Sequence, residues 1–176
     1  MFDKILVAVD VSEDSKYVFE SALDLAKAKQ ASLMLLHVLS LEEENCPEID
    51  GFASSDYYSG LHEAAVIRYR HQWDEFEKQS LEYLRSLANQ ANAQGIPTEF
   101  TQTPGSIGAI VCKLASNWGA NLIVVGRRGR SGLSELLLGS VSNYVMHRAP
   151  CSVLIINRPG AVVAQIEPEV PVEIAS

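Results

Sequence analysis

The sequence has few basic residues and no long apolar run. Its 14 lysines and arginines are outnumbered by 22 aspartates and glutamates, which gives the 176 residues a formal net charge of −8. Such a protein repels nucleic acids and anionic membranes over most of its surface, so we expect neither as a partner. No apolar run approaches the ~20 residues of a membrane-spanning helix. The N-terminus shows no signal-peptide pattern, and we expect a cytoplasmic protein.

Cysteine is equally scarce. Cys46, Cys112 and Cys151 form no C-x-x-C pair and have no metal-ligand spacing. We expect three reduced thiols, with Cys46 exposed and the other two in the core. The sequence also lacks the G-x-G-x-x-G fingerprint, the Walker A loop, a serine nucleophile elbow and a metal-ligand cluster. The common signals of dinucleotide binding, P-loop chemistry and metal catalysis are therefore missing, and we predict no catalytic or metal-binding residue.

Apolar runs alternate with helical patterns along the chain. The runs predict five strands, which cover residues 4–9, 32–39, 96–102, 121–125 and 151–156. Apolar residues at helical spacing predict four helices between them, and the longest, over residues 61–94, should lie across the sheet. This alternation favours an α/β fold in residues 1–157. We predict a single doubly wound domain with a five-stranded parallel sheet, in strand order 3-2-1-4-5, and helices on both faces.

Two segments depart from this pattern. Residues 40–60 are acidic and carry proline and several glycines and serines, so we interpret them as a long insert loop with Glu42 and Glu43 in a solvated charge run. A loop of that length is either functional or disordered. We predict that it moves and gates the ligand crevice, and the alternative is an insert without a role. Residues 158–176 contain three prolines and form a C-terminal tail.

The predicted strand order places the first and fourth strands side by side, and ligands bind at the carboxyl ends of strands at such a switch point. Asp10 ends the first strand and Gly126 ends the fourth. Three glycines and three arginines lie within residues 126–132. Glycine lets backbone N–H groups approach a ligand, and the next helix offers its positive N-terminus. The sequence thus predicts a phosphate-binding loop, and the alternative is a solvated basic connection.

The spacing of Gly126, Gly129, Gly139 and Ser140 resembles the ATP-binding signature of the universal stress protein family. The resemblance extends over residues 2–157. Within it, the segment Lys4–Asp10 is similar to the family's first strand with its aspartate. It implies a Rossmann-like fold and a module that binds ATP or another adenine nucleotide, with the participation of Mg²⁺ left open. The module would act in the stress response or in signalling through the conformation of a dimer or a loop.

The resemblance also implies which residues touch the nucleotide. Asp10 and Val38 would contact adenine or ribose. Ribose and phosphates would be held by a second group, which consists of Gly126, Arg127, Gly129, Gly139, Ser140, Val141 and Ser142. His37, alone in an apolar strand, is expected to be a hydrogen-bonded structural residue.

Three kinds of function remain at this stage. We favour a binding module over an enzyme, because no nucleophile, general base or carboxylate pair for magnesium accompanies the loop. A slow ATPase or phosphoryl-transfer enzyme is one alternative, and a dimerising scaffold that works without nucleotide is the other. The last strand, Cys151 to Ile156, is apolar and should have an open edge, so we predict a homodimer through it.

Overall fold

Strands and helices alternate along the whole domain, as the sequence predicts. The computed structural model describes residues 2–41, 43, 46–47, 59–127 and 139–157. The elements are β1 (Lys4–Ala8), α1 (Glu13–Lys29), β2 (Ser32–Leu39), α2 (Ser59–Ala93), β3 (Thr98–Pro104), α3 (Ile107–Trp118), β4 (Leu122–Gly126), α4 (Ser140–Arg148) and β5 (Ser152–Ile156). In this part of the chain no helix is long and apolar enough to cross a membrane.

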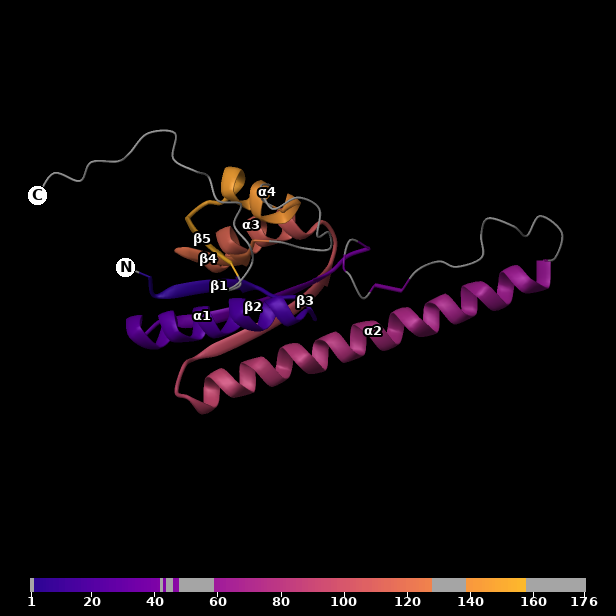
Figure 1. Cartoon of the computed structure of the whole chain (residues 1–176), viewed down its shortest axis with the longest axis horizontal. Helices are drawn as coiled ribbons and strands as arrows, with labels where there is room; N and C mark the ends of the chain where they lie inside the picture. The colour runs from indigo at the N-terminus through magenta and orange to yellow at the C-terminus, as the bar shows by residue number, and fades with distance from the viewer. Residues whose placement is uncertain (1, 42, 44–45, 48–58, 128–138, 158–176) are drawn as a thin grey trace, which may run out of the picture.

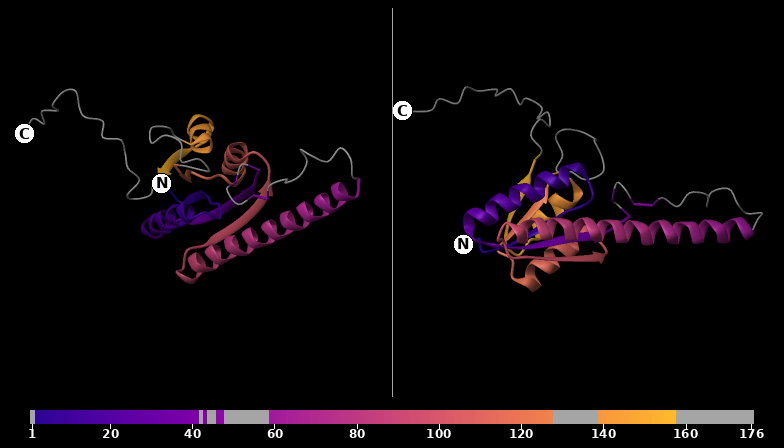
Figure 2. Two further views of the ribbon diagram at one scale, coloured as in Figure 1. Left: turned by 45° about the vertical axis from the view of Figure 1, so that its right-hand side comes forward. Right: turned by 90° about the horizontal axis from the view of Figure 1, so that it is seen from below.

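The strands form one parallel sheet in the order β3-β2-β1-β4-β5, which confirms the predicted fold (Figure 1). The central strand β1 pairs with both β2 and β4. Neighbouring side chains of a strand point to opposite faces, so Ile5 and Val7 enter one apolar cluster and Leu6 enters another. Helices α1 and α2 cover the first cluster, and α3 and α4 cover the second (Figure 2). Both faces of the sheet are therefore buried.

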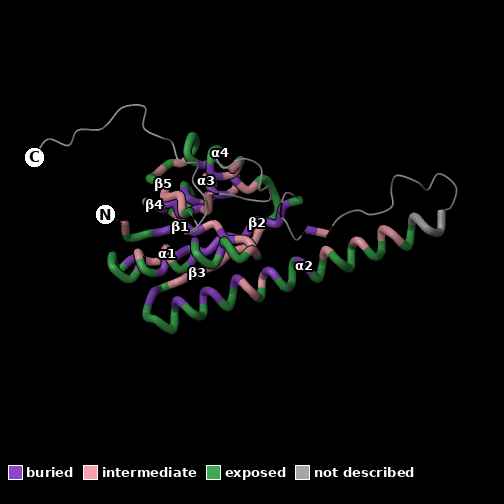
Figure 3. The backbone as a smooth tube through the Cα atoms, viewed as in Figure 1, coloured by how far each residue is buried: buried purple, intermediate pink, exposed green. Residues whose placement is uncertain are grey.

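Helix α2 departs from the predicted arrangement. Its C-terminal part packs on the sheet, where Leu84, Leu87 and Ala91 are buried in the α1-side cluster. Its N-terminal part runs past the sheet and is largely exposed (Figures 1 and 3). Aromatic rings contact one another along this projecting stretch. The centroids of Tyr69 and Trp73 are 6.3 Å apart, and those of Trp73 and Phe76 are 5.9 Å apart. The expectation that the whole helix lies across the sheet is thus correct only for its C-terminal part.

The segment after β2 begins as a folded turn rather than a solvated loop. The N–H of Glu43 donates to the carbonyl of Ser40, and the N–H of Cys46 donates to the carbonyl of Glu43, both at 3.2 Å. Ser40, Glu43 and Cys46 are each 8% exposed, whereas Leu41 is 63% exposed. The predictions that Glu43 is solvated and that Cys46 is exposed are therefore wrong. The turn directs every third side chain inward, and residues 48–58 lie outside the described chain.

The other two cysteines are half-buried against the α3-side cluster, rather than fully in the core. Burial raises the pKa of the Cys112 thiol, against the opposing charge of Arg148. Burial also raises the pKa of the Cys151 thiol, and the neighbouring Cys112 adds to that rise. Both groups therefore remain thiols at neutral pH.

Candidate functional site at the carboxyl ends of β1 and β4

The switch point lies between β1 and β4, because the chain leaves these adjacent strands toward opposite faces of the sheet. Asp10 follows β1, and Gly126 is the last residue of β4. On the other side of β1, the pairing with β2 ends at Ala8 opposite Leu36. Two further residues along each segment bring Asp10 level with Val38. The structure thus gathers Asp10, Val38 and Gly126 at one edge of the sheet.

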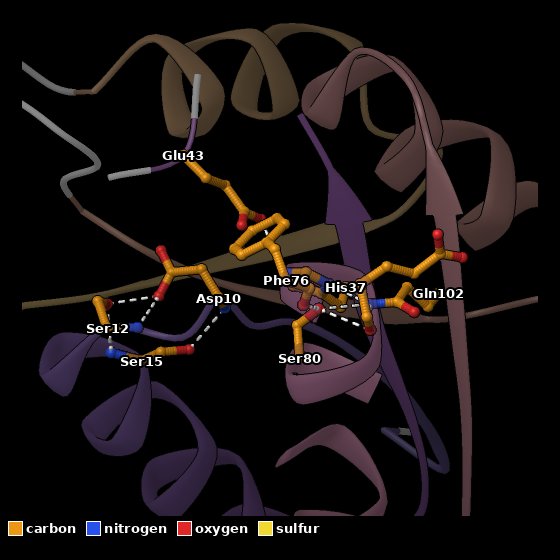
Figure 4. A network of polar contacts seen from close by, with 9 residues as sticks. Asp10, Ser12, Ser15, His37, Glu43, Phe76, Ser80 and Gln102 are labelled. Carbon is orange, nitrogen blue, oxygen red and sulfur yellow. Dashed lines mark hydrogen bonds and ion pairs between the residues drawn. The ribbon is translucent and has the colours of Figure 1, made fainter. Parts of the chain in front are cut away.

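Asp10 is held by the turn that starts α1 (Figure 4). Its Oδ1 accepts the N–H of Ser12 at 2.9 Å and also contacts the Ser12 hydroxyl. The N–H of Asp10 in turn donates to Oγ of Ser15 at 2.9 Å, and Oγ of Ser12 caps the helix by accepting the N–H of Ser15. The carboxylate is half-buried and fixed in orientation by α1. It acts as a helix-entry residue and at the same time stands at the switch point.

Asp10 and two acidic side chains of α1 act on Tyr83 of α2. Burial raises the pKa of the Tyr83 phenol, and the charges of Asp10, Glu13 and Glu20 raise that pKa further. A carboxylate here can accept hydrogen bonds from hydroxyl or amino groups, but it repels phosphate. Any phosphate would therefore lie on the opposite side, toward Arg127 and α4.

Two backbone hydrogen bonds close the base of the glycine-rich loop. The N–H of Arg127 donates to the carbonyl of Ile156 at 2.8 Å, which extends the pairing of β4 with β5. The N–H of Gly139 donates to the carbonyl of Arg127 at 3.0 Å. The two ends of the loop are thereby joined. Gly129 belongs to residues 128–138, which lie outside the described chain.

Ser142 reinforces this closure from inside α4. Ser142 is 1% exposed. Its hydroxyl oxygen lies 3.0 Å from the carbonyl oxygen of Gly139 and 3.1 Å from that of Arg127. One hydroxyl proton is shared between the two acceptors. The side chain is therefore engaged in the loop base, and the whole residue, backbone included, is buried at the start of α4.

Helix α4 begins at this closed base. Gly139 is the N-cap residue, and no side chain caps the helix. The carbonyl of Gly139 accepts the N–H of Asn143 at 2.9 Å, as expected for the first turn of a helix. The first N–H groups of an α-helix have no acceptor within the helix; here they belong to Ser140, Val141 and Ser142. These donors, with the partial positive charge of the helix end, suit an anion beside Gly126.

Val38 contributes to the site differently from the polar residues. Its side chain is 3% exposed and packs in the α3-side cluster. A ligand could therefore touch Val38 over only a small area. The preceding residue, His37, is 2% exposed and faces the other surface of β2.

His37 belongs to a buried polar network (Figure 4). Its Nδ1 lies 2.9 Å from Nε2 of Gln102, which also donates to Oγ of Ser80 at 2.7 Å. Its Nε2 lies 2.8 Å from Oε1 of Glu43. The structural role expected for His37 is confirmed, but its partners were not identified from the sequence. The only signals were a serine on the apolar stripe of α2 and a glutamine at an inward position of β3.

The described residues hold no cluster of three histidine, cysteine or acidic side chains that could bind a metal ion. The chemistry of the crevice is therefore a carboxylate on one side and backbone donors with Arg127 on the other. This arrangement can orient a ligand that has hydroxyl or amino groups at one end and negative charge at the other.

Comparison with known proteins identifies relatives of this chain. The sequence matches the universal stress protein family over residues 1–157. A universal stress protein of Synechocystis sp. is 36% identical over 158 residues, which cover 88% of this chain and 97% of that protein.

Two solved structures are similar in fold. The crystal structure of a universal stress protein in complex with cAMP has a TM-score of 0.56 at 24% identity, over 89% of this chain and 97% of the other. A family protein from Arabidopsis thaliana with AMP bound has a TM-score of 0.56 at 19% identity, over 90% of this chain and 93% of the other. At these identities the likeness shows the fold.

Proposed function

The chain belongs to the universal stress protein family, and we propose that it is a binding module for ATP or another adenine nucleotide. The observation that carries the proposal is the closed loop base, in which the Gly139–Arg127 hydrogen bond sets the start of α4 beside the switch point. The adenine nucleotides bound by two proteins of the same fold support the choice of ligand.

The polarity of the crevice determines the orientation that we propose. Asp10 accepts from the ribose or adenine side, next to the backbone of Val38. The phosphates lie against the opposite group, which comprises Gly126, Arg127, Gly129, Gly139, Ser140, Val141 and Ser142. Within that group Ser142 and Gly139 also hold the loop base together. The Ser142 hydroxyl and the Gly139 N–H therefore shape the site.

We favour binding over catalysis for this site. Phosphoryl transfer depends on positioning and on neutralising charge with metal ions and cations. The crevice offers Arg127 and helix N–H groups, but the only carboxylate we assign to it is Asp10, whose Oδ1 is engaged by Ser12. Mg²⁺, if it takes part, would neutralise charge on the phosphates, and Asp10, which we place on the ribose side, is not assigned to hold it. Slow hydrolysis is the alternative, and phosphate release above the background rate would support it.

The output of binding would be a change in a dimer or in the loops around the site, within the stress response or signalling in the cytoplasm. The edge of the sheet formed by β5 supports the dimer, because four consecutive apolar residues there, Val153 to Ile156, remain half-exposed in the single chain. Pairing with the same strand of a second copy would bury them in a two-fold interface. A monomer in sedimentation at micromolar concentration would contradict this part of the proposal.

The ligand itself can be identified directly. Purified protein should release an adenine nucleotide on denaturation, as detected by mass spectrometry, or bind added ATP in a calorimetric titration after removal of bound ligand. ATP should bind more tightly than adenosine, because the helix end and Arg127 act on phosphate. Equal affinity for both, or no binding of either, would reject the assignment.

A further inference from the structure

A second feature lies at the same edge of the sheet, in the network around His37. Three polar residues of this network are almost fully buried: His37 at 2%, Ser80 at 1% and Glu43 at 8% exposure. They come from β2, from α2 and from the turn after β2. Buried polar groups persist where partners satisfy them, so their arrangement fixes these three parts of the chain relative to one another.

The network defines the proton positions on His37. Oγ of Ser80 donates to the carbonyl of Phe76 at 2.6 Å, so its oxygen is left to accept from Gln102. Nε2 of Gln102 faces that oxygen, the carbonyl of Glu77 at 3.3 Å and Nδ1 of His37 at 2.9 Å. Because the amide nitrogen is a donor, Nδ1 accepts. The neutral imidazole then carries its proton on Nε2, the nitrogen that faces Glu43.

The contact between His37 and Glu43 is close but not aligned as a hydrogen bond. Oε1 of Glu43 lies 2.8 Å from Nε2, yet Nε2 has no partner in hydrogen-bonding geometry. The attraction is therefore electrostatic, between a carboxylate and the polar N–H. The ring of Phe76 stands edge-on to the imidazole, with centroids 6.3 Å apart, and adds an apolar contact to His37.

The backbone of Glu43 also takes part in hydrogen bonds next to His37. Hydrogen bonds from the N–H of Glu43 to the carbonyl of Ser40 and from the N–H of Cys46 to the carbonyl of Glu43 form a turn directly after β2. On the far side, the N–H of Gly105 donates to the carbonyl of Leu39 at 3.1 Å and holds the end of β2 to the end of β3. The carboxyl end of β2, which includes Val38, is thus held to β3 on one side, and the turn that contains Glu43 follows it directly.

We propose that His37 and Glu43 are positioning residues, whose contact holds the turn formed by Ser40, Glu43 and Cys46 at the carboxyl end of β2 and thereby positions the part of the nucleotide site beside Val38. This inference rests on the proposed function for the identity of the ligand. Without the contact, this part of the site occupies its binding-competent position for a smaller fraction of the time. The dissociation constant rises as that fraction falls. A fall to a tenth weakens adenosine and ATP alike, by about tenfold.

The test compares Glu43→Ala, Glu43→Leu and Glu43→Gln with a matched control, Glu99→Ala, which removes an exposed carboxylate from β3. Glu43→Leu fills the same space without a partner for Nε2, so it serves if the alanine variant folds poorly. Glu43→Gln keeps an acceptor oxygen and should restore most of the effect. Amide hydrogen exchange of nucleotide-free protein is measured at Glu43 and Cys46, and adenosine and ATP are titrated into each variant.

We expect exchange at these two amides to quicken about tenfold or more in Glu43→Ala and Glu43→Leu, while the amides of β2 keep the parental rate. Both ligands should weaken by the same factor, and Glu99→Ala should match the parent. Combining Glu43→Ala with His37→Phe should weaken binding no further than the worse single change, since residues that act as one unit are not additive.

Parental exchange at Glu43 and Cys46, or parental affinity in Glu43→Ala and Glu43→Leu, would overturn the proposal. So would a loss confined to ATP. A parent chain that binds neither ligand would instead reject the proposed function. The exchange rates would then still decide whether the His37–Glu43 contact holds the turn.

Discussion

Replacing Gly139 by serine should separate the stability of α4 from its capacity to bind phosphate. Gly139 is the N-cap residue with φ −58° and ψ 154°, a backbone conformation that ordinary residues adopt, so the change introduces no backbone strain. Serine is favoured at N-caps because its oxygen accepts a first-turn N–H, but its gain over glycine is only a few tenths of a kcal/mol. Gly139→Ser should therefore melt at or slightly above the temperature of the parent.

The same serine oxygen would compete with phosphate for a donor of α4. A hydrogen bond to a charged group is worth ~1.5–3 kcal/mol, and ~1.4 kcal/mol corresponds to a factor of ten in affinity. ATP should therefore bind roughly tenfold to two-hundredfold more weakly. Adenosine, which has no phosphate, should bind as it does to the parent.

The assay is a calorimetric titration with ATP and with adenosine, after a thermal melt has shown that the variant is folded. Gly139→Val is the companion variant, since it adds bulk beside the phosphates without an oxygen that can cap the helix. We expect both variants to lose ATP affinity selectively. Parental affinity for ATP in both, or an equal loss for adenosine, would refute the reasoning that α4 binds phosphate through its backbone donors.

Three further changes test other parts of the account. Arg127→Ala should weaken ATP more than adenosine in calorimetry, and a difference that does not shrink as salt is raised would argue against an exposed ionic contact. Asp10→Ala should weaken the binding of both ligands alike. Through the loss of the Ser12 hydrogen bond, it should also lower the free energy of unfolding in urea by about 1 kcal/mol. A loss of affinity for ATP alone would contradict the position of Asp10 on the ribose side. Gly108→Ala would put a Cβ 2.6 Å from Cδ1 of Tyr144. The resulting crowding, which costs ~1–3 kcal/mol, should outweigh the ~1 kcal/mol gain in helix propensity, so the variant should melt below the parent. Melting at or above the parental temperature would show that α3 and α4 move apart enough to relieve the crowding.

The fold could be predicted from the sequence because its determinants are local. Apolar runs such as Leu122–Val125 are too uniform for anything but strands buried on both faces, and the rules for parallel connections then leave few strand orders. The position of Asp10 and Gly126 at one edge follows from that order. The closure of the glycine-rich loop, in contrast, depends on a hydrogen bond between residues 127 and 139 that no local pattern indicates.

Glu43 shows where local reasoning fails. It lies in an acidic stretch, and most such stretches are solvated. Its burial depends on His37, which is six positions earlier, and on Gln102, which lies opposite His37 on the neighbouring strand β3 but 65 positions later in the sequence. The same holds for Cys46, which the turn directs inward. Tertiary partners, rather than composition, decide the burial of these side chains.

The most direct test of the central claim is to follow the backbone amide resonances of ¹⁵N-labelled protein while ATP is added. The account predicts that the largest shifts occur at Arg127, at the N-cap Gly139 and at Ser140 and Val141 of α4, with a second group near Asp10. Adenosine should shift the Asp10 group and leave the α4 group nearly unchanged. Shifts concentrated elsewhere, for example along the projecting part of α2, or no shifts at millimolar ATP, would contradict a nucleotide site at the carboxyl ends of β1 and β4.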